Sequence, residues 1–477
     1  MAPDSEQGIL SSMSINGPLG ATARRTAFEP RASIRPSARA GTSRMGQLAL
    51  VGTVLLGVLI SVSAARTKAV LPEIALDPSM EGPFGQLGLH LPLGALLASL
   101  TMVFVCYVTV VRVSDRLSIR SVLIAIAALN ALLLLGPPLF STDIFSYQGY
   151  AREWLTYGVN PYMRGATVMQ MDPLYYYIGA KWITTPTVYG PLFTSLSGLW
   201  AGATIATSLF WFKALAAVSC LGTVAIIWHA SRLRGLDPTR GVALFGLNPL
   251  VVLYGVGGGH NDLIMLVLST AAIWAVLAHR QRLSGASIML ATAVKLTAGL
   301  TLPFALAAGP ELGAGSRRRK LLLGAAITAA GIASLSFALF GLGIFNLLPT
   351  LHLVQTEGDW HSLPGFVNSV TRSPVAGQVV GIVLGLVFIA VFVRLLRRVW
   401  RGEMDWVDGL GWATLAMLVT ASAVLPWYVA WLLPVTALST DRRLWKWALI
   451  ISGVLLFTTM LSYLPTSDTF LGIPVVP

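Results

Sequence analysis

The sequence contains little charge and little cysteine for a chain of 477 residues. Charged residues make up only 11% of it, less than half of the roughly 25% that is usual in soluble domains. A soluble fold of this size needs far more charge to cover its surface. The two cysteines, Cys106 and Cys220, both lie inside apolar runs. This excludes a disulfide framework and a cysteine-based metal cage.

Apolar sequence is what the chain has in excess, with 55% hydrophobic residues. Low charge and high hydrophobicity together predict a polytopic membrane protein and exclude a soluble, disordered or disulfide-stapled secreted chain. In a soluble protein, the net charge of +13 would suggest nucleic acid as a partner. In a membrane protein, the excess of basic residues on the cytoplasmic side explains it better, so no nucleic acid is expected.

Residues 1–45 differ in composition from everything after them. They are rich in Ser, Pro, Ala and Gly, and their basic residues are all arginines: Arg24, Arg25, Arg31, Arg35, Arg39 and Arg44. Because such a segment buries too little apolar surface to fold, we expect a disordered cytoplasmic tail ahead of a transmembrane domain over 46–477. A signal peptide is the competing interpretation, but the first apolar run begins near Met45 and lacks a convincing cleavage site.

Apolar runs long enough to cross a bilayer as a helix, about 20 residues, recur along the chain. The clear candidates are 46–66, 91–111, 121–140, 214–231, 241–256, 263–279, 321–346, 375–398, 409–424, 425–440 and 444–464. Gly and Ser interrupt residues 191–210, while Lys295 and Pro303 interrupt residues 284–309, which favours a broken pair there. We therefore predict an all-α bundle of about 11–14 membrane helices.

The orientation of the bundle follows from the placement of Lys and Arg. The short loops on one side carry many basic residues and are taken as cytoplasmic, whereas 67–90, 141–190 and 347–374 on the other side carry few. We therefore expect a multi-pass plasma-membrane protein with a cytoplasmic N-terminus and these three loops outside. With the loop 141–190 outside and the basic residues near 232 inside, the chain must cross the membrane an odd number of times between 190 and 232. Residues 191–210 are therefore expected to form a re-entrant or interfacial helix pair.

The loop 141–190 is the most informative stretch for chemistry. Asp143 directly follows an apolar span, so it should lie at the membrane boundary, where partial loss of hydration makes a carboxylate more basic. That suits a general base which takes a proton from a hydroxyl. Asp143 could equally cap a helix over 144–155, because Ser-Thr-Asp is a good N-cap sequence. The sequence leaves both interpretations open.

Aromatic and charged residues follow Asp143 in the same loop. Tyr147 and Tyr189 are typical of the headgroup level of a membrane, and such rings also stack on the apolar faces of sugars. Arg152 lies in the same predicted helix, where it could be an ordinary solvated residue.

A second polar group occupies residues 255–262. The run Gly257-Gly258-Gly259 lets backbone approach a ligand closely. The next three residues then enter an apolar span from the outer side, where ionisable groups are costly and usually functional: His260, Asn261 and Asp262. The alternative is a polar loop with a helix capped at Asp262. His260 and Asp262 are only two possible metal ligands, which is too few for a metal site, so no metal is expected.

Three further places carry candidate residues. Lys295 is the lone charge in 284–309 and could face a lipid phosphate or extend to the interface. Trp427 lies near the outer end of a span, where such residues usually belong to the aromatic belt or to packing. The loop 347–374 holds polar residues that could complete an acceptor site, among them Glu357, Asp359, His361 and Arg372.

These landmarks, taken in order, resemble the GT-C class of integral-membrane glycosyltransferases. They are Asp143, Asn160-Pro-Tyr, Tyr189-Gly-Pro, Asn248-Pro, Gly259-His-Asn-Asp and Pro426-Trp-Tyr. More closely, most of residues 46–465 resembles the actinobacterial polyprenol-phosphate-mannose-dependent α-(1→6)-mannosyltransferases of lipomannan assembly. In many GT-C enzymes the acidic loop follows the first helix, whereas here it follows the third. The single Asp143, in place of an Asp-Asp pair, argues against a metal-dependent variant.

The resemblance implies an inverting transfer of mannose from a polyprenyl-phosphate-mannose donor to a lipid-linked mannoside. The reaction would extend the α-(1→6)-mannan backbone of lipomannan and lipoarabinomannan on the outer face, with membrane lipids around the site and no cofactor. Asp143 would be the base. The donor phosphate would be bound by His260, Lys295, Arg152 and Arg372. The sugar and acceptor would be bound by Tyr147, Tyr189, Asn261, Asp262, Glu357, Asp359, His361 and Trp427.

A secondary transporter or lipid flippase is the alternative function. It would explain the number of helices, the broken span at 284–309 and the polar residues inside the membrane. It explains less well why the long polar loops all lie on one side. Apart from Lys295, the central spans also hold few of the charges that a transporter usually needs near the midplane.

Overall fold

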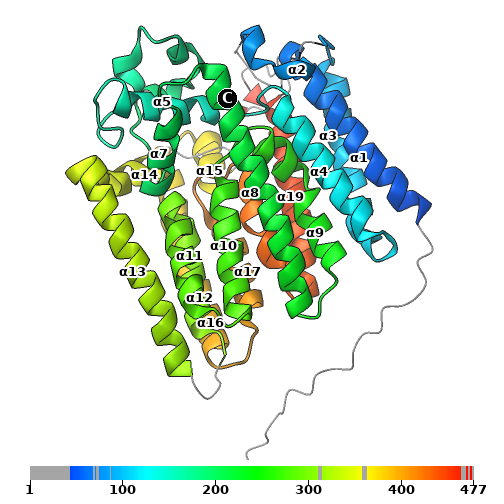
Figure 1. Ribbon diagram of the computed structural model, residues 1–477, viewed down its shortest axis with the longest axis vertical. Coiled ribbons are helices and arrows are strands. Elements are labelled where there is room, and N and C mark those ends of the chain that lie inside the picture. The colour runs from blue at the N-terminus through cyan, green and yellow to red at the C-terminus, as the bar shows by residue number, and fades with distance from the viewer. Residues whose placement is uncertain are drawn as a thin grey trace, which may run out of the picture. The chain divides into compact units, whose positions relative to one another are not determined.

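The computed structural model describes residues 43–67, 70, 75–85, 87–309, 314–356 and 362–463, with two short strands near the C-terminus. The strands are β1 (Thr469–Phe470) and β2 (Ile473–Pro474), which pair antiparallel. Nearly all of the predicted tail lies outside the described residues. The described part of the chain is otherwise helical (Figure 1).

The first helices form an antiparallel group at one edge of the bundle (Figure 1). Ser43 caps the first helix by accepting a hydrogen bond from the Gly46 backbone, and Ser118 caps a later one through Ser121. The elements are α1 (Arg44–Ser63), η1 (Ala64–Arg66), η2 (Pro78–Met80), α2 (Gly82–Gly85), α3 (Leu93–Arg112), η3 (Ser114–Arg116) and α4 (Ile119–Leu135).

Short helices make up the region between residues 136 and 204, which lies at the upper end in Figure 1. They are α5 (Asp143–Leu155), η4 (Ala166–Met169), η5 (Pro173–Tyr177), α6 (Ala180–Thr184), α7 (Pro191–Ser197) and η6 (Gly198–Trp200). Their shortness follows from the sequence, since Gly and Pro recur throughout this region and end each helix early.

The remaining helices form the rest of the bundle. They are α8 (Ile205–Leu233), α9 (Pro238–Gly246), the π-helix η7 (Leu250–Val256), α10 (Asp262–Leu277), α11 (Gln281–Val294), η8 (Leu296–Leu300), α12 (Thr301–Ala307), α13 (Ala314–Phe340), η9 (Gly341–Asn346), α14 (Leu347–Thr356), α15 (Leu363–Thr371), α16 (Pro374–Trp400), α17 (Trp406–Thr420), η10 (Pro426–Trp431), α18 (Leu433–Ala437) and α19 (Arg442–Ser462).

Helices that are interrupted inside the bundle are the feature that positions the site. The chain bends by 48° between α9 and η7, at Asn248-Pro249, where the ring of proline cannot continue a helix. The Asn248 side chain stabilises the bend by donating to Ser452 and accepting from the Leu250 backbone. Lys295 adopts an extended conformation between α11 and η8, so the predicted break within 284–309 is confirmed.

The expected membrane spans all coincide with helices. Every candidate run from 46–66 to 444–464 falls on a helix or on a pair of helices separated by a bend. In the described residues, six helices are long and apolar enough to cross a membrane alone, and the bent α9–η7 pair would be a seventh. The others, such as α4 and α10, are shorter. The chain is thus an all-α polytopic membrane protein, in which several of the expected spans are too short to cross unaided.

Only the first part of the helix pair expected at 191–210 forms separate short helices. Residues 191–200 form α7 and η6, but the chain from Ile205 onward already belongs to α8. Thr204 starts α8 by accepting a hydrogen bond from the Thr207 backbone. Between 190 and 232, the one helix long and apolar enough to cross a membrane in the described residues is α8, so the odd number of crossings there remains a prediction.

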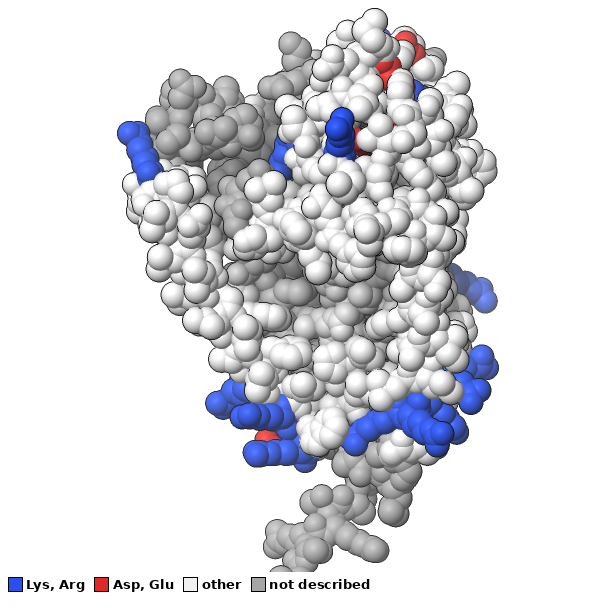
Figure 2. Space-filling view, turned by 90° about the vertical axis from the view of Figure 1, so that its left-hand side faces the viewer, with Lys and Arg blue, Asp and Glu red and all other residues white. Residues whose placement is uncertain are grey.

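Basic residues gather at one end of the bundle. Helices α3, α8 and α16 carry Arg in their last turns, while α13 and α19 carry Arg in their first turns. Figure 2 shows the blue side chains concentrated at the lower end of the face in view. The labels α2, α5, α14 and α15, which belong to the three long loops, lie at the upper end in Figure 1. The basic residues and the three long loops therefore lie toward opposite ends of the structure, as the charge pattern of the sequence predicts.

We predict that the upper end faces the outside of the cell, because basic loops are retained in the cytoplasm. Met171, whose side chain is 96% exposed, is replaced by cysteine in a background without Cys106 and Cys220. An impermeant maleimide should label it in intact cells. Arg401→Cys, at a side chain that is 72% exposed near the basic end, is the matched control and should be labelled only after the membrane is opened. The reverse pattern would refute this orientation.

Candidate functional site

Polar residues from four separate segments meet where helices begin or break. Asp143 opens α5, His260 lies in the turn before α10, and Lys295 lies in the break after α11. The fourth segment is η10, which contributes the rings of Trp427 and Trp431. In a membrane protein, irregular backbone is tolerated only where other segments of the protein surround it or where it lines a cavity. These breaks therefore indicate a functional site. We call this group the polar cluster; its members are Asp143, His260, Asp262, Lys295, Trp427 and Trp431.

Asp143 is the first helical residue of α5, and Thr142 occupies the N-cap position. The carboxylate of Asp143 is directed at His260, with Oδ2 3.6 Å from Nδ1, and only 15% of its side chain is exposed. Burial raises the pKa of Asp143 to about 6, although the nearby Lys295 lowers it. Asp143 is therefore not the N-cap residue, and its environment makes it more basic than an ordinary aspartate.

His260 is fully buried against an aromatic ring. Its imidazole stacks on Trp427 with ring centroids 3.8 Å apart, and its Nδ1 is 3.4 Å from the Tyr147 hydroxyl. Burial lowers the pKa of His260 to about 3, so the ring is uncharged at neutral pH. Its Nε2 atom, like the side-chain amide of Asn261, has no hydrogen-bond partner among the residues that the structure describes. Buried polar atoms without a partner are costly, which points to a ligand here.

Asp262 is held by two donors from distant parts of the chain. The Lys295 Nζ donates to its Oδ1 at 2.7 Å, and the Trp431 Nε1 donates to the same oxygen at 2.6 Å. The Lys295 ammonium also lies over the rings of Tyr428 and Trp431, at 4.5 and 5.0 Å from their centroids. The ammonium is thus engaged inside the cluster, and the interpretation that Lys295 extends to the membrane interface is wrong.

Tyr147 and Tyr189 form an inner wall and do not belong to an exposed aromatic belt. Their rings meet edge to face at 5.0 Å, and Tyr147 makes a similar contact with Phe193 at 4.8 Å. The Tyr147 hydroxyl also accepts a long hydrogen bond of 3.5 Å from the Asn261 backbone. These contacts fix the Tyr147 hydroxyl beside His260.

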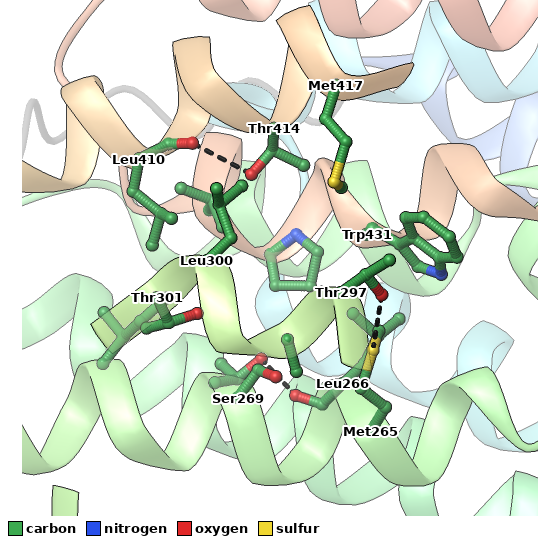
Figure 3. A pocket seen from close by; sticks show the side chains of 15 residues that line it. Met265, Leu266, Ser269, Thr297, Leu300, Thr301, Leu410, Thr414, Met417 and Trp431 are labelled. Carbon is green, nitrogen blue, oxygen red and sulfur yellow. Dashed lines mark hydrogen bonds between the residues drawn. The ribbon is translucent and has the colours of Figure 1, made fainter. Parts of the chain in front are cut away.

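An apolar cavity lies next to the polar cluster, and Trp431 borders both (Figure 3). It is lined by residues of α10, η8, α12, α17, η10 and α18. Thr297, two residues after Lys295, also lines it and donates to the sulfur of Met265. The other side chains labelled in Figure 3 are Leu266, Ser269, Leu300, Thr301, Leu410, Thr414 and Met417.

Comparison with known proteins places this architecture in a family. A family model described as "Alpha-(1->6)-mannopyranosyltransferase, N-terminal domain" matches residues 46–309. The chain belongs to this family. A second model, described as "MptB C-terminal domain", matches residues 363–476. The resemblance to α-(1→6)-mannosyltransferases predicted from the sequence is confirmed.

Individual relatives agree with this assignment. The chain is 29% identical over 334 residues to "Alpha-(1->6)-mannopyranosyltransferase A" of Mycobacterium tuberculosis, covering 65% of this chain and 64% of that protein. It is 28% identical over 365 residues to a "Probable alpha-(1->6)-mannopyranosyltransferase" of Mycolicibacterium smegmatis, covering 65% and 63%. The similarity therefore spans less than two thirds of the length of these relatives.

Several predicted site residues lie away from the cluster. Arg152 forms an ion pair with Asp172 at 2.6 Å and donates to the Ala203 carbonyl at 2.8 Å, so its guanidinium ties the outer segments together. Arg372 is exposed at the end of α15. The predicted roles of both in phosphate binding gain no support from this geometry. The other candidates of loop 347–374 lie outside the described residues: Glu357, Asp359 and His361.

No set of three or more His, Cys, Asp or Glu side chains within the described ranges could hold a metal ion. The expectation of a metal-independent reaction remains a prediction from the sequence.

Two buried residues near the site were missed from the sequence. Trp431 lies four positions after Trp427, a spacing that places both on one helical face and could have indicated a shared role. Lys213 is fully buried in α8. It is the lone lysine in a long apolar run, which is the same signal that identified Lys295, but it precedes the candidate span 214–231 by one residue.

We predict strong coupling between Lys295 and Asp262. Breaking a buried ion pair from one side typically costs about 3–5 kcal/mol, because the partner is left as an uncompensated buried charge. Lys295→Met and Asp262→Asn should therefore each lower the thermal stability of the purified protein. The double variant, which carries both substitutions, should lose less stability than the two single variants lose together. Additive losses in the double-mutant cycle would show that the pair contributes no coupling.

Proposed function

We propose that the chain is an inverting mannosyltransferase which moves mannose from a polyprenyl-phosphate-mannose donor onto a lipid-linked mannoside. On this proposal it is a GT-C enzyme that acts at the outer face of the plasma membrane and extends the α-(1→6)-mannan of lipomannan. Family membership supports mannosyl transfer. The observation that carries the proposal is the buried Asp143 carboxylate beside His260, whose Nε2 atom has no partner among the described residues, in a cluster that Trp431 connects to an apolar cavity.

The proposed step needs one base and one group that stabilises the leaving phosphate. Asp143 takes the proton from the acceptor hydroxyl, and the oxygen attacks the anomeric carbon of the donor. The bond between that carbon and the phosphate oxygen breaks, and the lipid phosphate leaves with the electron pair. Attack from the opposite face inverts a β-linked mannose to an α-mannoside. In the tautomer that carries its proton on Nε2, His260 and the Lys295 ammonium are the donors available to the developing phosphate charge.

The surroundings of the two carboxylates separate their roles. Asp262 accepts hydrogen bonds from Lys295 and Trp431, so it is held as a structural anion. Asp143 faces a neutral imidazole, and burial raises its pKa to about 6. A base with this pKa is ionised at neutral pH and is still basic enough to accept a proton. Asp143 is therefore the candidate base.

The apolar cavity supports a lipid-linked donor. Thr297 lines the cavity two residues after Lys295, so a phosphate near the ammonium would have its isoprenoid chain beside the apolar lining. A nucleotide-sugar donor would have no use for such a lining next to the reacting phosphate. The family model and the relatives described above are mannosyltransferases by name and give no support to the transporter or flippase alternative.

We predict that Asp143→Asn reduces transfer by about 10²–10⁴-fold, the usual contribution of a general base. Donor binding should persist, because the substitution keeps the shape of the side chain. The assay measures mannose transfer from labelled polyprenyl-phosphate-mannose by purified enzyme. Asp77→Asn is the matched control, since Asp77 caps η2 in another outer loop and Asn is an equally good cap. Turnover near that of the wild type in Asp143→Asn would eliminate the base assignment.

The same assay should show an acid limb in kcat/KM near pH 6. Since burial raises the pKa of Asp143 to about 6, the base is ionised above this pH and is lost by protonation as the pH falls. A limb near the ordinary value for aspartate, about 3.9, would contradict the buried environment of Asp143.

A further inference from the structure

Lys213 is a buried lysine for which the proposed reaction has no role. It lies in α8, with 2% of the residue exposed. Its Nζ donates to the backbone carbonyls of Gly136 and Pro137, and the structure gives it no carboxylate partner among the described residues. A methionine would fill similar space without the cost of burying a charge. The two hydrogen bonds that the Lys213 amine donates indicate what this side chain does.

The two carbonyls that Lys213 binds belong to the segment that leads to Asp143. Helix α4 ends at Leu135, and Gly136 is its C-cap, so the carbonyls that follow have no helical partner. The Lys213 amine supplies a hydrogen-bond donor to these carbonyls at the C-terminus of α4. From there, residues 136–142 run as irregular backbone, and their last residue is the N-cap of α5. Lys213 thus anchors the start of this connecting segment.

The stem of Lys213 also contacts the turn that carries His260. Gly259 has a φ of +67°, and a Cβ atom on it would lie 3.4 Å from Lys213 Cγ and 2.5 Å from Ile144 Cδ1. The turn is therefore packed against both Lys213 and the residue that follows Asp143. A hydrogen bond of 3.1 Å from the Leu139 backbone to the Gly257 carbonyl joins the same two segments.

We propose that Lys213 is a positioning residue which sets the placement of Asp143 relative to His260. The inference rests on the proposed function, in which Asp143 is the base. The separation of 3.6 Å between Asp143 Oδ2 and His260 Nδ1 is longer than a normal hydrogen bond, so that contact cannot hold the two segments by itself. Beside the single hydrogen bond from Leu139 to Gly257, Lys213 adds a second connection, through Gly136 and Pro137 on one side and Gly259 on the other.

The charged and titratable groups around Asp143 determine what its displacement would change. Those that face it from other elements, or from its own helix, are Lys295, Asp262, Lys181, His260, Tyr147, Tyr150 and Tyr189. If the connecting segment loosens, water reaches Asp143 and the burial that raises its pKa is reduced. Its pKa then falls toward the ordinary value. A role of Lys213 in stability alone would leave this pKa unchanged in the molecules that fold.

The test compares Lys213→Met and Lys213→Gln with the wild type. Thr223→Val is the matched control, because Thr223 is buried in the same helix and its hydroxyl bonds only the helix backbone at Ser219. Transfer is measured per folded molecule, with the folded fraction taken from the monodisperse peak in size-exclusion chromatography. The readouts are kcat, the donor KM and the position of the acid limb.

We expect Lys213→Met to lower kcat by about 10–100-fold, the effect of a displacement of about 1 Å at a reacting group. The donor KM should change by less than about twofold, because uniform binding contacts remain. The acid limb should move below its wild-type position. Lys213→Gln should be intermediate, since its amide can still donate to a carbonyl, and Thr223→Val should match the wild type.

The inference is overturned if folded Lys213→Met keeps the wild-type kcat and acid limb. If Lys213→Met does not fold, Lys213→Gln decides in the same way. Asp143→Asn is measured in parallel. An active Asp143→Asn overturns the proposed function itself, whereas an inactive one together with unaffected Lys213 variants overturns only the role of Lys213.

Discussion

The ion pair between Lys295 and Asp262 connects three parts of the bundle that are far apart in the sequence. Lys295 lies in the break after α11, Asp262 opens α10, and Trp431 of η10 donates to the same carboxylate oxygen. A buried charge without a partner is costly, so the placement of each of these segments depends on the others. The break at Lys295 is therefore part of the assembly of the site, and Trp431 connects the ion pair to the adjoining cavity.

The same constraint explains why the site consists of helix starts and breaks. A regular helix satisfies its own backbone and offers only side chains, whereas a broken one exposes amide and carbonyl groups that need partners. Here those partners come from buried side chains: Asn248 at the bend after α9 and Lys213 after α4. Backbone groups at two of the breaks near the polar cluster are thus satisfied by buried side chains, which helps to hold Asp143 and His260 in place.

The sequence predicted the residues of the cluster better than it predicted their pairing. Asp143, His260 and Lys295 could be found because a charged or polar residue within apolar sequence is costly and therefore informative. That Lys295 binds Asp262 could not be found, because this contact depends on how α10 and α11 pack. Arg152 is a second example: a guanidinium in the outer loop suggested a phosphate ligand, and the sequence did not indicate that Asp172 of the same loop binds it. Span lengths were also hard to predict, because capping by Thr204 decides where α8 begins.

The central claim is that the polar cluster and the adjoining cavity receive one lipid-linked mannosyl donor. A photoreactive group on the first isoprene unit of polyprenyl-phosphate-mannose tests this directly, with the adducts mapped by mass spectrometry. The account predicts adducts on the cavity lining, on peptides with Met265, Thr297 or Met417, and their loss when unlabelled donor competes. Adducts confined to the exposed apolar faces of α13 and α16, unaffected by competition, would contradict it.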